Sequence, residues 1–361
     1  MGGGAVACQL IAGLEEREVQ PPRDAATPID TLPPLDVAAE AACETCGTAS
    51  CVDPTTDPNN CGFCGHSCGG ACTGGLCPVL DVYGGFTNGA ALAIDDANLY
   101  VAERQGVWAV RKTDNVVQKI VSGFFPQGVT TAAGRVYVSQ PFQIVRVLPD
   151  GGQLQVLFAR DAGGSVPING DLAADPPWTF WTTQSGLLGV SEDGGPVVDV
   201  LPEDASVDGS LGPSSLGVNA SNVYYLRGYD LVRAARDGTT RDKIGSSLTG
   251  GTRLALTSDS VVWGDGATIR RTGFDGGATL IATSSGTSDV AVYKGRIYWS
   301  EVGTGTQTGA IMTIPLAGGT PSPLATKLSA PGRIAVDDGY VYWLENLSSG
   351  SLPSPVRKVA R

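Results

Sequence analysis

The feature that most constrains this chain is a pattern that recurs seven times between residues 92 and 345. Each copy is an apolar segment, a polar turn and an aromatic segment, as in LAIDDANLYVAE (92–103) and IAVDDGYVYWLE (334–345). The other copies begin at residues 129, 172, 216, 254 and 290. Their aligned positions, 36 to 44 residues apart, are Tyr100, Tyr137, Phe180, Tyr224, Val262, Tyr298 and Tyr342. A period near 40 residues indicates a repeat architecture with several strands per unit.

Each unit continues in the same way after its aromatic segment. A third short strand such as Val107–Val110 leads into a tight turn such as Asp150-Gly151-Gly152, and a fourth strand such as 154–158 follows. Asp-Gly supplies the positive φ angles that short hairpin turns need. Each unit therefore predicts a four-stranded antiparallel blade, and the whole predicts an all-β, seven-bladed β-propeller. Six blades with one degenerate unit, or eight blades, are the alternatives.

The two ends of the array predict how the ring closes. The seventh unit stops at its third strand, Val356–Ala360, and so lacks a fourth. A fourth strand precedes every later copy, and residues 79–83 hold the same place before the first copy. We therefore expect residues 79–83 to form the fourth strand of the last blade and to pair with its open edge. Four tryptophans share one aligned position and are expected to pack between blades: Trp181, Trp263, Trp299 and Trp343.

Cysteine and charge divide the chain into three parts. All nine cysteines lie in residues 1–77, which also carry 10 Asp and Glu against 2 Arg, so this part accounts for −8 of the net charge of −12. Residues 1–42 are rich in Pro, Ala and acids and predict an N-terminal anchor region and disordered linker. Residues 43–77 predict a Cys-rich module, and residues 78–361 the propeller. The acid excess argues against a nucleic-acid partner, because phosphate binding needs a basic surface.

Eight cysteines fall within residues 43–77, and Gly, Asn, Ser and Thr separate them. They are Cys43, Cys46, Cys51, Cys61, Cys64, Cys68, Cys72 and Cys77. A segment this short needs covalent links in place of a core, which favours disulfides of undetermined pairing. The spacing of two Cys-x2-Cys pairs also fits a zinc site, but such a site would use only half of the cysteines. His66, the one histidine, is expected to be a solvated loop residue.

Cys8 follows Ala5-Val6-Ala7, and small residues before a cysteine are the pattern at which bacterial lipoproteins are lipidated. The seven preceding residues are too few for a signal peptide, so we expect that the true signal lies upstream of the given start. A free thiol is the alternative. Because disulfides form in oxidising compartments, the expected location is extracytoplasmic, in the periplasm or on a bacterial outer surface, lipid-anchored or secreted.

Two motifs resemble known families. Ile297-Tyr298-Trp299-Ser300-Glu301 and the segment 341–345 resemble the YWTD-type repeat of extracellular propellers. The motif's acid, which the resemblance implies to be a structural tie between strands, is matched at Glu103, Asp265, Glu301 and Glu345. Asn60-Cys61-Gly62-Phe63-Cys64-Gly65 is similar to the Asn-Cys-Gly-x-Cys-Gly leader of bacterial surface proteins, which precedes a propeller. Together they imply architecture and location more than activity.

The candidate site is a ring of side chains that follow the aromatic strands on one face of the disc. It comprises Glu103, Gln140, Thr183, Arg227, Asp265, Glu301 and Glu345. Four acids against one Arg could attract a cation or a basic partner, although capping carboxylates at strand ends are the favoured interpretation. No nucleophile elbow, P-loop or HExxH motif occurs, so no catalytic residue is expected.

The function predicted from these features is binding of a protein or a glycan by a propeller scaffold. The protein is expected to be a monomer that meets a membrane only through its lipid anchor. The alternative is a propeller lyase or hydrolase that uses carboxylates or a metal at the mouth of the central channel, which the lack of His in residues 78–361 disfavours. No cofactor is expected. Ca²⁺ would need several carboxylates or amides around one point, and Zn²⁺ is the alternative for the Cys cluster.

Overall fold

The fold is known from a computed structural model, which describes residues 46, 52–123, 125–160, 168–202, 212–246, 251–345 and 353–361. In these ranges the regular elements are β-strands, labelled β1 to β28. Cys8, Cys43 and Cys51 lie outside the described residues, as does most of the predicted linker. Within the described part, the chain forms no helix long and apolar enough to cross a membrane.

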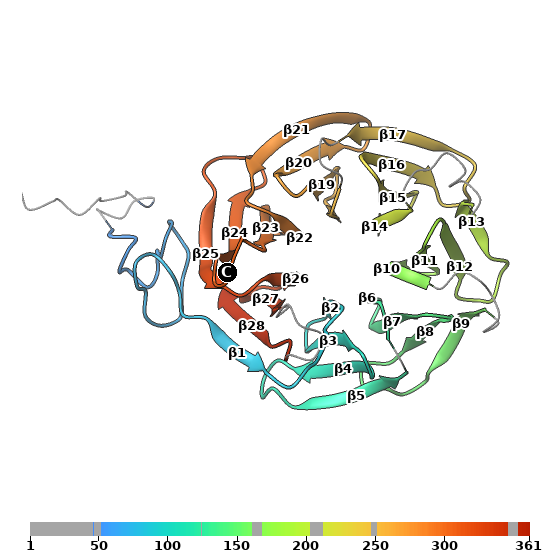
Figure 1. The fold of residues 1–361 in the computed structure, drawn as a ribbon, viewed down its shortest axis with the longest axis horizontal. Helices are drawn as coiled ribbons and strands as arrows, with labels where there is room; N and C mark the ends of the chain where they lie inside the picture. The colour runs from blue at the N-terminus through green and yellow to red at the C-terminus, as the bar shows by residue number, and fades with distance from the viewer. Residues whose placement is uncertain are drawn as a thin grey trace, which may run out of the picture. The chain divides into compact units, whose positions relative to one another are not determined.

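Seven four-stranded antiparallel sheets, the blades, stand around a common axis, which confirms the seven-bladed β-propeller (Figure 1). Blade 1 comprises β2 (Ala91–Ile94), β3 (Asn98–Glu103), β4 (Gly106–Arg111) and β5 (Val117–Ser122). Blade 2 comprises β6 (Gly128–Ala132), β7 (Arg135–Gln140), β8 (Gln143–Val147) and β9 (Gln155–Ala159). Blade 3 comprises β10 (Ile168–Asp175), β11 (Trp178–Thr183), β12 (Leu187–Ser191) and β13 (Val198–Leu201).

The next three blades repeat this order along the chain. Blade 4 comprises β14 (Pro213–Val218), β15 (Asn222–Arg227), β16 (Asp230–Ala235) and β17 (Arg241–Ser246). Blade 5 comprises β18 (Arg253–Leu256), β19 (Ser260–Gly264), β20 (Thr268–Gly273) and β21 (Gly276–Thr283). Blade 6 comprises β22 (Thr287–Tyr293), β23 (Arg296–Glu301), β24 (Gly309–Pro315) and β25 (Ser322–Leu328).

Blade 7 closes the ring with strands from both ends of the described chain. Its strands are β26 (Pro331–Val336), β27 (Tyr340–Glu345), β28 (Val356–Ala360) and β1 (Leu80–Tyr83). β1 runs antiparallel to β28, and Leu80 is paired with Lys358. The Arg357 guanidinium lies 2.8 Å from the Asp81 carboxylate across the same pair. The segment 79–83 thus supplies the fourth strand at the edge that the seventh unit leaves open.

The first strand of every blade faces the axis, and each later strand lies further out (Figure 1). First and second strands are antiparallel, so the start of one lies beside the end of the other, as Thr287 beside Glu301. We call the face that holds these ends the mouth face. The opposite face carries the turns between first and second strands, such as Asp95–Ala97.

The core lies between the blades, where apolar side chains of neighbouring sheets meet. The four aligned tryptophans, Trp181, Trp263, Trp299 and Trp343, are fully buried, as the sequence predicts. Trp263, for example, packs with Leu231 and Ile244 of the preceding blade. Both faces of a blade are covered, which explains why the second strands are apolar along their length. Removing such a tryptophan side chain would cost roughly 3–5 kcal/mol of stability.

Disulfides hold the module that precedes β1. The structure joins Cys46 to Cys64, Cys61 to Cys72, and Cys68 to Cys77. Cys61 and Cys77 also belong to a buried cluster with Leu324 of β25 and Val359 of β28. The described part of the module therefore packs on the outer strands of blades 6 and 7, and borrows their apolar surface for a core.

His66 corrects one prediction, because it is buried and not a solvated loop residue. Its Nε2 lies 3.1 Å from the carbonyl oxygen of Ala360, and its Nδ1 lies near that of Cys61. The ring stacks on Phe63, whose ring contacts the Arg296 guanidinium of blade 6 at 4.4 Å from its centroid. The histidine thus joins the module to the last strand in the chain, a long-range contact with no local signal in the sequence.

Candidate functional site

The seven side chains of the predicted ring, which we call the outer ring, lie at the ends of the second strands and bond to nearby groups. Glu103 accepts hydrogen bonds from the indole Nε1 of Trp108 at 2.8 Å and from the backbone N–H of Gln105 at 3.2 Å. The Gln140 amide donates to the carbonyl oxygen of Ser122, and Thr183 Oγ1 accepts from the N–H of Gly186. The contacts of Glu103 and Thr183 lie in the residue's own hairpin, whereas Gln140 reaches the end of β5 in the preceding blade.

The remaining outer-ring residues follow the same rule. Asp265 is buried and accepts from the backbone N–H groups of Ala267 and Thr268 and from Arg270 Nε at 3.1 Å. Glu301 accepts from the indole of Trp299 at 2.8 Å, and Glu345 accepts from Arg357 at 2.9 Å. Arg227 lies at the end of β15 and is half-buried. These are the contacts of capping side chains, and binding at the outer ring stays a prediction.

A second set of equivalent positions lines the axis, and we call it the inner ring. Each member lies in a first strand, two residues before the residue that pairs with the aligned aromatic position of the second strand. Ala93 pairs with Tyr100, so the member in blade 1 is Ala91. Ala291 pairs with Tyr298, so the member in blade 6 is Asp289. The inner ring comprises Ala91, Gly128, Asp171, Ser215, Arg253, Asp289 and Arg333. Blades 1 and 2 contribute no polar side chain to it, whereas the five blades that follow contribute two Asp, two Arg and a Ser.

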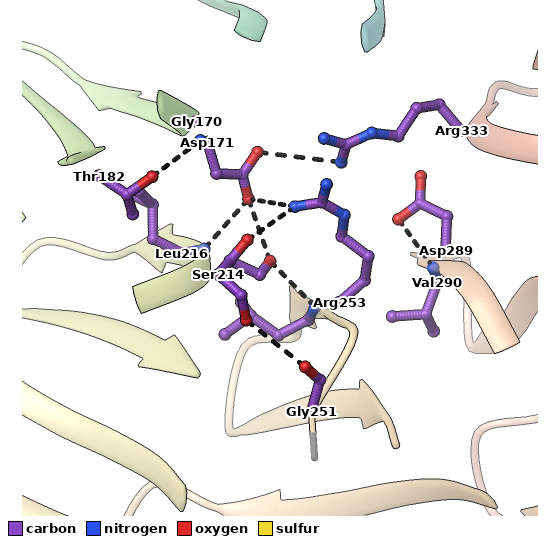
Figure 2. Close-up of polar contacts among 12 residues, drawn as sticks. Gly170, Asp171, Thr182, Ser214, Leu216, Gly251, Arg253, Asp289, Val290 and Arg333 are labelled. Atoms are coloured by element: carbon purple, nitrogen blue, oxygen red, sulfur yellow. Dashed lines mark hydrogen bonds and ion pairs between the residues drawn. The ribbon is translucent and has the colours of Figure 1, made fainter. Parts of the chain in front are cut away.

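The four charged members, the axial cluster, point toward one another across the axis (Figure 2). The Asp171 carboxylate lies between the two guanidinium groups. Its Oδ2 is 3.4 Å from Arg253 Nη1, and its Oδ1 is 3.9 Å from Arg333 Nη1. The side chains of Asp171, Arg253 and Arg333 keep about a fifth of their surface exposed, so water reaches the cluster.

Three inner-ring side chains also tie neighbouring blades together. Each accepts a hydrogen bond from the first strand of the next blade: Asp171 from Leu216 N at 3.1 Å, Ser215 from Leu254 N at 3.3 Å and Asp289 from Ile334 N at 2.9 Å. These ties satisfy backbone groups that have no strand on the inner side to pair with. Strand pairing is irregular next to these positions in blades 3, 4 and 6, and such bulges re-aim side chains.

The two carboxylates of the axial cluster have opposite electrostatic environments. Burial alone would raise the pKa of Asp171, but Arg253, Arg333 and two hydrogen bonds hold that pKa below its ordinary value. Burial raises the pKa of Asp289, and the same two arginines do not offset it. Burial lowers the pKa of Arg333, and the adjacent positive charge of Arg253 lowers it further. The cluster therefore favours one ionised carboxylate and one that holds its proton more tightly.

The two guanidinium groups have donors left over. Arg253 Nη1 donates to the carbonyl oxygen of Ser214 at 3.0 Å, and Arg333 Nε donates to that of Ala90 at 3.3 Å. Among the residues that the structure describes, Nε and Nη2 of Arg253 and Nη2 of Arg333 have no hydrogen-bond partner. A guanidinium offers five N–H groups, so both side chains can take a further acceptor from the axis.

An apolar pocket of about 440 Å³ opens on the mouth face between blades 1 and 2. Phe125 and Phe142 line it and are 47% and 40% exposed, and the amides of Gln140 and Gln143 lie beside them. Gln140 follows Ser139, which pairs with the inner-ring residue Gly128, so the pocket begins one strand outward from the axis. Exposed aromatic rings with convergent amides are typical of small-molecule sites.

The sequence contains a signal for the inner ring that the prediction did not use. Every inner-ring residue immediately precedes one of the seven copies: 91 precedes 92, 128 precedes 129, and so on to 333 before 334. Extending the alignment by one residue would have shown Ala, Gly, Asp, Ser, Arg, Asp and Arg in one column. Charged residues at the start of an innermost strand point to the axis of a propeller.

The structure also places the residues considered for a metal. In its described part, the metal-ligating side chains that converge are Cys61, Cys68 and Cys77, whose sulfur atoms lie within 4.8 Å of one another. All three are in disulfides, so they offer no thiolate. At the axis, Asp171 pairs with arginines, which compete with a cation for its oxygens. The geometry there favours an anion over a metal ion.

Comparisons with known proteins agree on the fold. No protein family and no curated protein matches the chain. Virginiamycin B lyase from Staphylococcus aureus matches with a TM-score of 0.62 and 12% identity, over 79% of this chain and 99% of the lyase. The computationally designed Ika8 protein matches with a TM-score of 0.55 and 9% identity, over 78% of this chain and 98% of that protein. At these identities the likeness shows a β-propeller and no shared activity.

Proposed function

We propose that the chain is an extracytoplasmic binding protein that holds an acidic glycan on the mouth face of its propeller. The observation that carries the proposal is the co-location on that face of an exposed aromatic pocket and a pair of arginines with free donors. An aromatic ring can stack on the apolar C–H face of a sugar, and amides such as those of Gln140 and Gln143 can bond to hydroxyl groups.

The disulfides support the location. The described disulfides of the module are typical of proteins that reside in oxidising compartments. Lipidation at Cys8 would hold the protein at a membrane surface. Both points are tested by intact-mass analysis of natively purified protein before and after reduction and alkylation. Free thiols throughout the module would contradict the proposed location.

Binding is tested with an array of neutral and acidic glycans. We expect retention of acidic glycans by the wild-type chain and a loss of about tenfold or more on Phe142→Ala, because the sugar loses its stacking surface. Leu280→Ala is the matched control, since Leu280 is an exposed apolar residue of the outermost strand of blade 5. Absence of glycan retention, with retention of a protein partner instead, would overturn the proposal in favour of protein recognition.

A lyase or hydrolase acting at the axis is the second candidate. The observation that favours it is the place of Asp289 beside the two axial arginines (Figure 2), where burial raises its pKa, because a carboxyl group with a raised pKa can serve as a general acid. Incubation with acidic polysaccharides tests it. Shortened products that disappear with Asp289→Asn would establish catalysis, and intact polymer at high protein concentration would exclude it for those substrates.

A further inference from the structure

The two arginines of the axial cluster form an arrangement that the fold alone does not require. Their guanidinium groups lie side by side at the axis, and both form ion pairs with the same carboxylate, that of Asp171 (Figure 2). Asp289 bonds instead to backbone N–H groups, those of Val290 and Ile334, each at 2.9 Å. Two like charges held together in a largely buried place repel each other, and each costs desolvation energy.

An acceptor from outside would relieve this repulsion. The unused donors belong to both arginines, and both side chains keep about a fifth of their surface open to water. A planar guanidinium fork matches the two oxygens of a carboxylate, and hydrogen bonds between charged groups are the stronger ones. The guanidinium groups of Arg253 and Arg333 can therefore donate hydrogen bonds to a ligand that approaches the axis from the mouth face.

The charge of the cluster selects the type of anion. Two guanidinium groups and two acidic side chains, those of Asp171 and Asp289, already face one another at the axis. A singly charged carboxylate brings less negative charge beside these two acidic side chains than a doubly charged phosphate does. The arrangement favours a monoanion.

We infer that Arg253 and Arg333 bind the carboxylate of a sugar acid, such as a uronic acid residue, at the propeller axis. This inference rests on the proposed glycan-binding function and assigns the group of the glycan that is recognised. Asp171 holds the two guanidinium groups in position from one side. Asp289 lies on the other side, where its carboxyl group accepts hydrogen bonds from the backbone N–H groups of Val290 and Ile334. The aromatic pocket of blades 1 and 2 would hold a neutral part of the same glycan.

The test measures binding of D-glucuronate and D-glucose to the full chain by calorimetric titration. We expect glucuronate to bind more tightly than glucose, and Arg253→Met or Arg333→Met to weaken it by about tenfold to a hundredfold. Arg333→Lys keeps the charge but loses the fork, so an intermediate loss is expected. Arg270→Met is the matched control, because Arg270 has a similar exposure and pairs with the outer-ring residue Asp265. Its affinity should stay within about twofold of wild type.

Three outcomes would overturn the inference. One is equal binding of glucuronate and glucose, and another is equal loss with the Arg270 and Arg333 variants. The third is competition by inorganic phosphate as strong as that by glucuronate. If glycans bind and depend on Phe142 but not on the arginines, the carboxylate assignment fails while the proposed function stands. If no glycan binds at all, the proposed function itself fails. Thermal unfolding of each variant shows whether it is folded, and Arg333→Lys decides the matter if the methionine variants are not.

Discussion

The outer ring and the inner ring are two sets of seven equivalent positions on the same face, and they use polar side chains differently. In the outer ring, an acid such as Asp265 finds three donors within five residues of itself. In the inner ring, Asp171 finds its partners 44 to 162 residues away, in blades 4, 5 and 7. The difference follows from the place of the two strands in the blade.

A second strand has a neighbour on each side and ends in a hairpin, so the side chain at its end meets backbone N–H groups in its own turn. A first strand has no neighbour on the axial side. Its side chains must find hydrogen-bond partners on other blades or in a ligand. Where the other blades supply fewer acceptors than there are donors, some donors stay free. Outer-ring acids such as Asp265 therefore stabilise their own blade, whereas the polar inner-ring residues join blades and face the axis.

The largest predicted effect on stability is that of Asp171→Ala. Removal of this carboxylate takes away the ion-pair partner of both Arg253 and Arg333 and leaves their charges close together, so we expect a loss of roughly 3–5 kcal/mol in unfolding free energy. The measurement is the urea midpoint together with the slope of the transition. A loss below about 1 kcal/mol would show that the arginines do not depend on Asp171.

Asp265→Ala is the outer-ring counterpart. It removes two backbone hydrogen bonds and one to Arg270, whose side chain lies near enough to solvent to turn outward. We expect a loss of roughly 1–2 kcal/mol in unfolding free energy, with binding of glucuronate unchanged. If binding fell as far as in Arg333→Met, the distinction between the two rings would not hold.

Asp289 and Asp171 should give the stability opposite slopes with pH. The pKa of Asp289 is raised by burial, so its contribution is fully present below the ordinary value of 3.8 and is lost as pH rises through the higher folded value. The pKa of Asp171 is lowered by Arg253 and Arg333 despite burial, so its contribution is present above 3.8 and is lost as pH falls.

The charged groups that face Asp289 are Asp171, Arg253 and Arg333, and Asp289→Asn leaves all three in place. We therefore expect this variant to lack the contribution of Asp289 to the pH dependence, which is a loss of stability as pH rises above about 4. Denaturation at a series of pH values checks this. An unchanged decline in the variant would assign it to another group.

The smallest expected effect is that of Glu103→Gln. The amide oxygen can still accept from Trp108 Nε1 and from the backbone N–H of Gln105, so the hydrogen bonds survive without the charge. We expect a change below about 1 kcal/mol in the unfolding free energy and none in binding. A larger loss would show that the charge itself, and not the acceptor, matters in the outer ring.

The sequence was sufficient to predict the architecture, because the same pattern occurs seven times and each copy supports the assignment of strands in the others. Each copy identifies one blade. The last unit ends at its third strand, Val356–Ala360, which indicates that a strand from elsewhere, β1, must complete the blade. Burial of the four aligned tryptophans follows from the same alternation of faces. Each of these features depends on residues close together in sequence or at a fixed period.

The axial cluster and His66 were not predicted, because both depend on contacts between distant segments. His66 reaches Ala360, 294 residues away, and nothing near residue 66 indicates that a blade lies there. The inner-ring residues are periodic, but their meeting depends on knowing that the first strand is innermost. The outer ring was found more readily because its acids are part of the recurring aromatic segment.

The central claim is that a ligand carboxylate enters between Arg253 and Arg333. The most direct test follows the ¹⁵N signals of the arginine side chains by NMR while D-glucuronate is added to the wild-type chain, with assignments from Arg→Lys variants. We predict saturable shifts for Arg253 and Arg333 and none for Arg270, and we expect D-glucose to shift none of the three. Shifts at Arg270 equal to those at the axial arginines, or unmoved signals from Arg253 and Arg333 while glucuronate binds, would contradict the central claim.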